Sequence, residues 1–250
     1  MINFFRKIRQ KLLQENRVSK YLIYAFGEIV LVVIGILIAL QINNWNEQQK
    51  QNSILDKYYK NLVQEFEGIL QEFETNHIPE NDFLIKELEI SLTLIKNKPI
   101  AYQDSLLNHL GAIGTAWGRN LTTPVLDKFN ESGLLNEIKT DSVKNAILQF
   151  NLFKDKLESN KLHSTEQYLQ TLEPYLLKNT NYSQIALKRY RKHFISGGPK
   201  TNINEIANSL ELWNMLTIKL ETCYYHKILW EEQFVPQIKK SLTVLKNQNP

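Results

Sequence analysis

The longest apolar run of the chain lies near its N-terminus. Every residue from 29 to 40 is apolar or glycine, and the apolar character extends over residues 21–42. A helix rises about 1.5 Å per residue, so this stretch covers roughly 33 Å, which is enough to cross the hydrocarbon core of a bilayer. Tyr21 and Trp45 lie at its two ends, where aromatic side chains favour the membrane interfaces. The pattern predicts a single transmembrane helix over residues 21–45.

Two other interpretations of this run are a buried core helix of a soluble protein and a signal peptide that is removed. A core helix seldom combines such a length with a basic flank on one side. A cleavage site needs small residues in an Ala-x-Ala pattern, which residues 38–41 do not provide. An uncleaved signal anchor is therefore the preferred interpretation.

An amphipathic stripe follows the apolar run. Apolar residues recur at alternating spacings of four and three, which is typical of a coiled coil: Leu55, Tyr59, Leu62, Phe66, Ile69 and Phe73. Residues 44–65 contain no glycine or proline, so we expect the transmembrane helix to continue into a helical stalk. Pro79 is expected to end this helix, because proline cannot donate the backbone hydrogen bond that continues it.

The rest of the chain shows helical periodicity interrupted by glycine and proline. Helices are predicted over residues 81–97, 125–131, from 141 onward, over 203–223 and over 237–246. Breaks are expected at Pro99, Pro174, residues 197–199 and Pro236. The predicted fold is all-α, with an N-terminal single transmembrane helix continuing into a stalk and an antiparallel helical bundle. Residues 46–250 form one extracytoplasmic helical domain in this prediction.

The basic residues of the chain are concentrated at its N-terminus. The formal net charge is +4, yet residues 1–20 hold six Lys or Arg against one Glu, so they carry +5 and residues 21–250 carry −1. A nearly neutral main part argues against a nucleic-acid partner, because such domains spread basic charge over a folded face. By the positive-inside rule, the N-terminus is predicted to be cytoplasmic and residues 46–250 periplasmic.

The basic segment, residues 1–20, also has an amphipathic part. Phe5, Ile8 and Leu12 recur at helical spacing over residues 1–13, and four basic residues lie between them: Arg6, Lys7, Arg9 and Lys11. Such a segment can lie along the inner leaflet and contact anionic lipid headgroups through these four residues. A short solvated tail is the alternative, since a helix of so few turns is weakly stable.

Glu28 is the one carboxylate within the apolar run. It shares a helix face with Gly35 and Ala39, which form a small-xxx-small pattern. This membrane-helix face, Glu28, Gly35 and Ala39, is a hypothesis for association with a second copy or with another membrane helix. The alternative is that Glu28 lies near the cytoplasmic boundary and extends its carboxylate to water or to the headgroups.

The residues of the N-terminal part resemble those of a known family. The sequences FFRKIRQKLL at residues 4–13 and SKYLIYAFGEIVLVVIGILIALQINNWNE at residues 19–47 are similar to the opening of the bacterial domain of unknown function 6090 family. Residues 126–138, LDKFNESGLLNEI, resemble the family more loosely. The resemblance implies a Gram-negative inner-membrane protein with a helical extracytoplasmic part, and it implies no activity, cofactor or site residue.

Few residues form patterns that carry chemistry. Glu74 and His77 have the i, i+3 spacing of di-iron bundles, but that site needs a second copy and two further glutamates, so no metal site is predicted. The other histidines are scattered, and Cys223 lies on an apolar helix face, where a buried thiol is expected. The basic run at residues 188–193 is expected to be a solvated helix face. No catalytic or cofactor-binding residue is predicted.

The sequence as a whole predicts a single-pass inner-membrane protein with a periplasmic helical domain. Its expected role is that of an interaction, scaffold or sensor module without catalysis, because a stalk that continues the membrane helix can pair helices or transmit a shift along its axis. The expected partners are the lipid bilayer and either a second copy or another membrane or periplasmic protein. The alternative is a membrane-tethered periplasmic enzyme whose active site assembles in the bundle.

Overall fold

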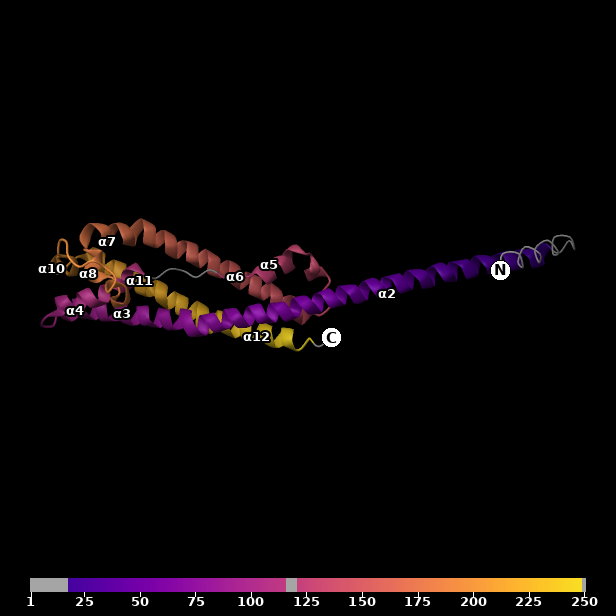
Figure 1. The fold of residues 1–250 in the computed structure, drawn as a ribbon, viewed down its shortest axis with the longest axis horizontal. Coiled ribbons are helices and arrows are strands. Elements are labelled where there is room, and N and C mark those ends of the chain that lie inside the picture. Colours follow the sequence, from indigo (N-terminus) through magenta and orange to yellow (C-terminus); the bar gives the residue numbers. More distant parts are fainter. Residues whose placement is uncertain (1–17, 116–120, 249–250) are drawn as a thin grey trace. The chain divides into compact units, whose positions relative to one another are not determined.

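The computed structural model describes residues 18–115 and 121–248 of the chain (Figure 1). It divides into two compact units, residues 1–56 and residues 57–250. Every regular element of the described residues is helical, which confirms the predicted all-α class.

The described part of the first unit belongs to helix α2 (Val18–Glu72). Fifteen large apolar side chains between Leu22 and Ile42 are exposed on it. Within the described residues, one helix is long and apolar enough to cross a membrane, and none of its most apolar window is buried. Because α2 is unbroken to Glu72, the predicted continuation of the apolar helix into the striped segment is confirmed.

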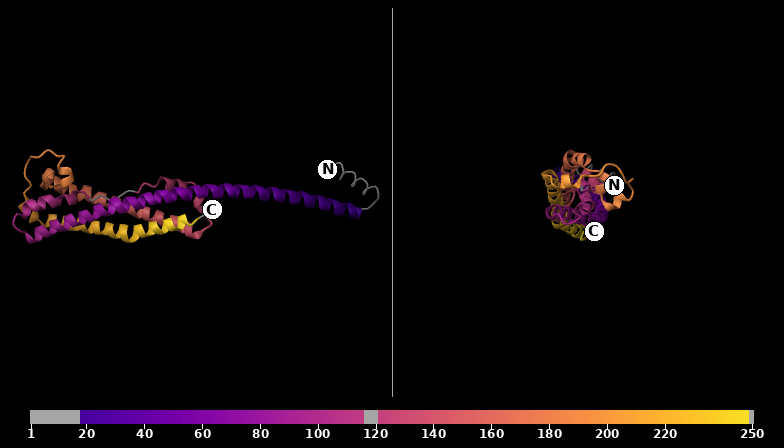
Figure 2. Two further views of the ribbon diagram at one scale, coloured as in Figure 1. Left: turned by 60° about the horizontal axis from the view of Figure 1, so that its bottom comes forward. Right: turned by 90° about the vertical axis from the view of Figure 1, so that its left-hand side faces the viewer.

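The second unit is built on three long helical rods, each made of an α-helix, a π-helical segment and a second α-helix. The first rod comprises α2 from residue 57, η1 (Phe73–His77) and α3 (Ile78–Asn97). The second comprises α6 (Asp141–Gln167), η4 (Tyr168–Leu172) and α7 (Glu173–Asn179). The third comprises α11 (Leu210–Lys227), η5 (Ile228–Phe234) and α12 (Val235–Lys246). The rods lie side by side (Figures 1 and 2).

The third rod runs antiparallel to the other two, which confirms the predicted antiparallel bundle. Against the first rod, Tyr224 Oη donates to Glu89 at 2.7 Å and Lys239 Nζ pairs with Glu74 at 2.7 Å. Against the second rod, Lys156 Nζ donates to Gln233 at 2.7 Å and the Ser241 hydroxyl donates to the backbone carbonyl of residue 146 at 3.2 Å. Residue numbers that rise along one rod therefore fall along the other.

A proline is the second residue after each π-helical segment. The N–H that closes the widened turn bonds to the carbonyl five residues earlier in all three rods: Ile78 to Phe73, Glu173 to Tyr168 and Val235 to Trp230. Proline has no N–H, and its ring collides with the carbonyl four residues before it, so an added residue in the preceding turn relieves both problems. The prediction that Pro79 ends its helix is therefore wrong, and Pro174 and Pro236 likewise lie inside rods.

Short helices join the rods and cover their ends. They are α4 (Tyr102–His109), η2 (Leu110–Gly114), α5 (Pro124–Glu131), η3 (Leu134–Asn136), α8 (Tyr182–Ile185), α9 (Lys188–Arg191) and α10 (Ile203–Ala207). The first rod ends before Pro99 as predicted, with Lys98 in a left-handed conformation. The predicted helix over residues 125–131 is confirmed by α5, and Gly133 in the turn that follows has a positive φ of 73°.

The hydrophobic core follows the length of the rods. At one end, α3, α7 and α11 pack with α4, η2, α8 and α10 around fully buried side chains such as Leu88, Leu106 and Leu216. At the other end, Phe66 of α2 stacks on Phe150 of α6, with ring centroids 3.9 Å apart. Burial of these large side chains stabilises the unit by about 1.5–3 kcal/mol each. Tyr168 and Leu172 of η4 belong to the first of these clusters, and Phe73 of η1 packs against Trp230 and Phe234 of η5.

Candidate functional site

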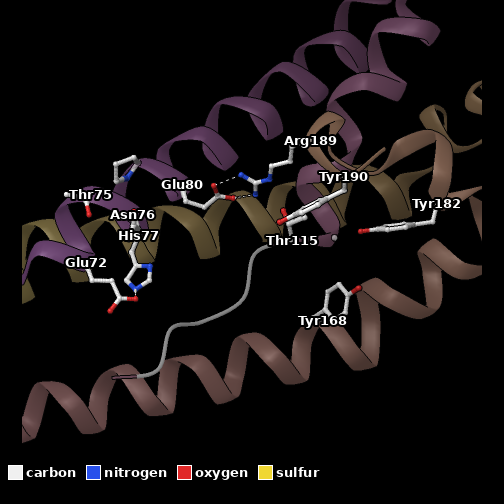
Figure 3. Close-up of a pocket in the computed structure, with 12 residues that line it drawn as sticks. Glu72, Thr75, Asn76, His77, Glu80, Thr115, Tyr168, Tyr182, Arg189 and Tyr190 are labelled. Atoms are coloured by element: carbon white, nitrogen blue, oxygen red, sulfur yellow. Dashed lines mark hydrogen bonds and ion pairs between the residues drawn. The ribbon is translucent and has the colours of Figure 1, made fainter. Parts of the chain in front are cut away.

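A cavity of about 930 Å³ opens beside the π-helical segments of the first and second rods. We call it the mid-bundle cavity. Its walls come from α2, η1 and α3 on one side, from η4 on another, and from η2, α8 and α9. The lining residues are Glu72, Thr75, Asn76, His77, Pro79, Glu80, Gly114, Thr115, Tyr168, Tyr182, Arg189 and Tyr190 (Figure 3). Widened turns of this kind often mark functional sites in helical proteins.

The π-helical turn η1 places a histidine next to a carboxylate at the cavity wall. His77 Nε2 lies 3.1 Å from Glu72 Oε1, a pairing across five residues that the widened turn makes possible. The Phe73 ring meets the imidazole edge-on with centroids 4.8 Å apart, and Trp230 of η5 packs at 6.3 Å. The imidazole is therefore fixed between an aromatic wall and a carboxylate.

A bidentate ion pair joins α9 to α3 across the cavity. Arg189 Nη1 donates to Glu80 Oε2 at 2.7 Å, and Nη2 donates to the other carboxylate oxygen. The guanidinium also lies over the rings of Tyr190 and Phe83, at 5.1 and 5.8 Å from their centroids. The hydrogen bonds that Arg189 donates to Glu80 raise the pKa of Arg189 further above its already high value. This pair therefore stays charged and closed at neutral pH.

Two tyrosines bring phenol groups to the cavity from other elements. Tyr168 comes from η4 and points toward the cavity in Figure 3, and Tyr182 comes from α8. Burial raises the pKa of both phenols above 10, so both keep their protons at neutral pH. A Cβ added at Gly114 would lie 2.9 Å from the Tyr182 hydroxyl. The glycine is thus needed for the position that this phenol occupies.

The membrane-helix face is helical as the sequence predicts. Glu28, Gly35 and Ala39 all lie in α2, whose 3.6-residue turn brings them to one side of the helix. Glu28 is half-buried, and a Cβ added at Gly35 would meet none of the described atoms within 4 Å. The role of this face in association stays a prediction. The predicted lipid contacts Arg6, Lys7, Arg9 and Lys11 lie outside the described residues.

The i, i+3 pair of Glu74 and His77 is not brought together. Glu74 pairs with Lys239 on the third rod, whereas His77 faces Glu72, because the π-helical turn changes which residues share a side of the helix. Within residues 18–115 and 121–248, no group of three or more His, Cys, Asp or Glu is arranged to hold a metal ion. Another histidine, His109, pairs with a carboxylate of α3 at 2.9 Å.

Two further sequence predictions concern single side chains. Cys223 is buried as predicted, and burial raises the pKa of its thiol to about 11. The basic run at residues 188–193 is largely exposed, as expected of a solvated face. Two of its members nevertheless make specific contacts, since Arg189 closes on Glu80 and Arg191 donates to the Asn108 side chain at 2.9 Å.

The sequence did not reveal the mid-bundle cavity, because its lining comes from segments far apart in the chain. The nearest local signal is a proline two residues after His77. Such a proline is compatible with a helix end or with a widened turn, and only the packing of the rods decides between them. The contributions of Tyr182 and Arg189 from α8 and α9 carry no periodic signal at all.

One protein family matches the chain over part of the apolar helix and of the first rod. The sequence model of a family described as a family of unknown function, DUF6090, matches residues 28–89. This confirms the resemblance seen in the N-terminal residues. The matched segment includes the membrane-helix face and, from the cavity wall, Glu72, His77 and Glu80. No curated protein and no solved structure matches the chain.

Proposed function

We propose that the chain is a single-pass inner-membrane protein that holds residues 46–250 in the periplasm as an interaction, scaffold or sensor module. The observation that carries the proposal is the exposed apolar run between Leu22 and Ile42. At about 1.5–3 kcal/mol for each buried large apolar side chain, covering these fifteen residues is worth roughly 20 kcal/mol or more. A bilayer supplies such cover along the whole circumference of one helix.

The charge pattern supports the orientation. Six Lys or Arg precede the apolar run, whereas Lys50 is the single basic residue among the ten that follow Ile42. Basic residues near a membrane helix are retained on the cytoplasmic side. The bundle is accordingly assigned to the periplasmic side, and the family resemblance supports a Gram-negative inner membrane.

The mid-bundle cavity supports a binding role for the helical domain. Its polar side chains come from several elements, and ion pairs hold Glu72 with His77 and Glu80 with Arg189, as in preformed ligand sites. A ligand that contacts the first rod and α9 at once favours one arrangement of these elements over others. The first rod continues into the helix that carries the apolar run, so this binding is suited to a sensor.

The anchoring is tested by placing charge in the middle of the apolar run. The double variant Val33→Arg/Leu37→Arg adds about 2.5–3.5 kcal/mol of insertion cost at each position. We expect the wild-type chain to stay in the membrane pellet after carbonate washing and the double variant to be released from it or degraded. The matched control Val33→Leu/Leu37→Ile keeps the run apolar and should behave like wild type. Carbonate release of the wild type, or full retention of the Arg variant, contradicts membrane anchoring.

The second candidate function is a membrane-tethered periplasmic enzyme, and the observation that favours it is the imidazole held by Glu72. A histidine oriented by a carboxylate at a cavity wall is suited to act as a general base. The test is hydrolysis of nitrophenyl esters and phosphates by the full chain and by His77→Asn. A rate that disappears in the variant supports an enzyme, and a rate that is independent of His77 refutes this assignment.

A further inference from the structure

The charged side chains of the mid-bundle cavity are paired with one another. The Glu80 carboxylate accepts two hydrogen bonds from the Arg189 guanidinium, and the Glu72 carboxylate faces His77. An anionic ligand would have to displace Glu80 from the guanidinium, and a cationic ligand would have to compete with His77 for Glu72. The Arg189 guanidinium makes two charge-assisted hydrogen bonds to Glu80, and an anion would have to replace both. The Glu72 side chain is 59% exposed, so its pairing with His77 contributes little free energy. The cavity therefore offers no advantage to an anionic ligand.

The other polar groups of the cavity are neutral. They are the phenols of Tyr168 and Tyr182, the amide of Asn76, and the hydroxyls of Thr75 and Thr115. The two threonine hydroxyls donate to backbone carbonyls at 2.8 and 3.1 Å, so each keeps lone pairs that can accept a hydrogen bond. Phenols and amides both donate and accept. This set suits a ligand that also carries many groups able to donate and accept.

Aromatic rings supply the apolar part of the same wall. Tyr190 is about half exposed, and Tyr168 and Tyr182 also line the cavity. A tyrosine combines an apolar body with a polar tip, which matches a ring that has C–H faces and hydroxyl edges. The volume of about 930 Å³ falls within the range of roughly 300–1,000 Å³ for small-molecule sites.

We infer that the mid-bundle cavity binds a small, neutral, hydroxyl-rich ligand of the saccharide class. The ligand ring lies against the tyrosines and its hydroxyls exchange hydrogen bonds with Asn76, Tyr168 and Tyr182. The Glu72 and Glu80 carboxylates add hydrogen-bond acceptors for the ligand hydroxyls. This inference rests on the binding role proposed for the helical domain, and it is independent of the side of the membrane on which that domain lies.

Binding is tested with the full chain in a detergent that has no sugar headgroup. The probes are glucose, N-acetylglucosamine and their β-1,4-linked disaccharides, with spermidine and inorganic phosphate as charged comparisons. Saturation-transfer NMR detects binding and calorimetry measures the Kd. We expect at least one saccharide to bind and to be favoured over both charged probes.

Substitutions of residues that line the mid-bundle cavity test whether the saccharide binds there. Tyr182→Phe and Asn76→Ala each remove one neutral hydrogen-bonding group, so each should weaken saccharide binding about three- to tenfold. Tyr225→Phe and Asn160→Ala, which lie in a separate groove between α6 and α11, are matched controls and should leave the Kd unchanged. Circular dichroism melting verifies that all four variants fold.

Three results would overturn the inference. They are the absence of binding by every saccharide, binding that is unchanged in the cavity variants, and preferential binding of spermidine or phosphate in the cavity. None of them bears on the membrane anchoring, which the carbonate test decides separately. Conversely, release of the wild type by carbonate would refute the anchoring and leave saccharide binding to be judged by these titrations.

Discussion

A buried lysine gives the most quantitative prediction about the bundle. Lys219 on α11 has none of its surface exposed, and burial lowers the pKa of its ammonium from 10.5 to about 8. A shift of this size corresponds to about 3 kcal/mol, because one pKa unit is worth about 1.4 kcal/mol. The free energy of unfolding is therefore reduced by about this amount at any pH at which Lys219 is charged in both the folded and the unfolded chain. Lys219→Met removes the charge and keeps the length of the side chain.

The sign of the pH dependence follows from the lowered pKa. Below pH 8 the folded and unfolded chains are both protonated at Lys219, so the full cost is present. Between pH 8 and 10.5 the unfolded chain binds more protons, and the free energy of unfolding contributed by this group rises with pH. We expect the free energy of unfolding of Lys219→Met to exceed that of the wild type by about 3 kcal/mol at pH 7 and by about 2 kcal/mol at pH 9.

The assay is urea denaturation of the detergent-solubilised chain, followed by far-UV circular dichroism from pH 6 to pH 9. The exposed Lys240 on α12 provides the control, and Lys240→Met should change the free energy of unfolding by no more than about 0.5 kcal/mol at any pH. If Lys219→Met is less stable than wild type at pH 7, or if the difference stays constant from pH 7 to pH 9, the reasoning from burial of the charge is wrong.

Three further predictions follow from close contacts and helix faces. Gly111→Ala should destabilise the bundle by about 3 kcal/mol or more, since an added Cβ would lie 2.5 Å from backbone atoms of α8 and the following residues. Gly68→Ala, in open space on α2, should instead stabilise the bundle by about 0.5–1 kcal/mol. Thermal melting measures both variants, and an equal change of melting temperature in the two would contradict this prediction. Glu65→Gln should cost about 1–3 kcal/mol in urea denaturation, because the carboxylate accepts the first two N–H groups of α5 at 2.8 and 3.1 Å, and an unchanged midpoint would show that this cap is dispensable. The pair Glu28→Leu and Gly35→Ile should reduce crosslinked oligomers in native membranes, and unchanged crosslinking would refute the association hypothesis.

The sequence predicted the elements that depend on local pattern. The apolar run and the stripe from Leu55 to Phe73 were sufficient to predict one continuous helix, and the bundle was predicted from further stripes of the same kind. The helix end before Pro99 was also predictable, because a proline disfavours the helical conformation in the residue before it. In the structure that residue, Lys98, is left-handed and the helix stops there. These features are set by residues that are neighbours in the chain.

Prediction from the sequence was wrong where tertiary packing decides between two local conformations. Pro79 was expected to end a helix, yet one added residue in η1 lets the rod continue, and the burial of Phe73 against the third rod favours that outcome. The same added residue pairs Glu72 with His77 instead of aligning Glu74 with it. The mid-bundle cavity was not predictable at all, because Arg189 reaches Glu80 from a segment 109 residues away.

We propose that the apolar helix anchors a helical domain in the periplasm, and single-cysteine labelling tests this proposal most directly. Cys223→Ala removes the one native cysteine, and Ser19→Cys or Ser159→Cys then places one thiol on either side of the apolar run. We predict that a membrane-impermeant maleimide labels Ser159→Cys, an exposed position on α6, in intact spheroplasts. Ser19→Cys should be labelled only after lysis. Labelling of Ser19→Cys in intact spheroplasts, with Ser159→Cys protected until lysis, would contradict the account.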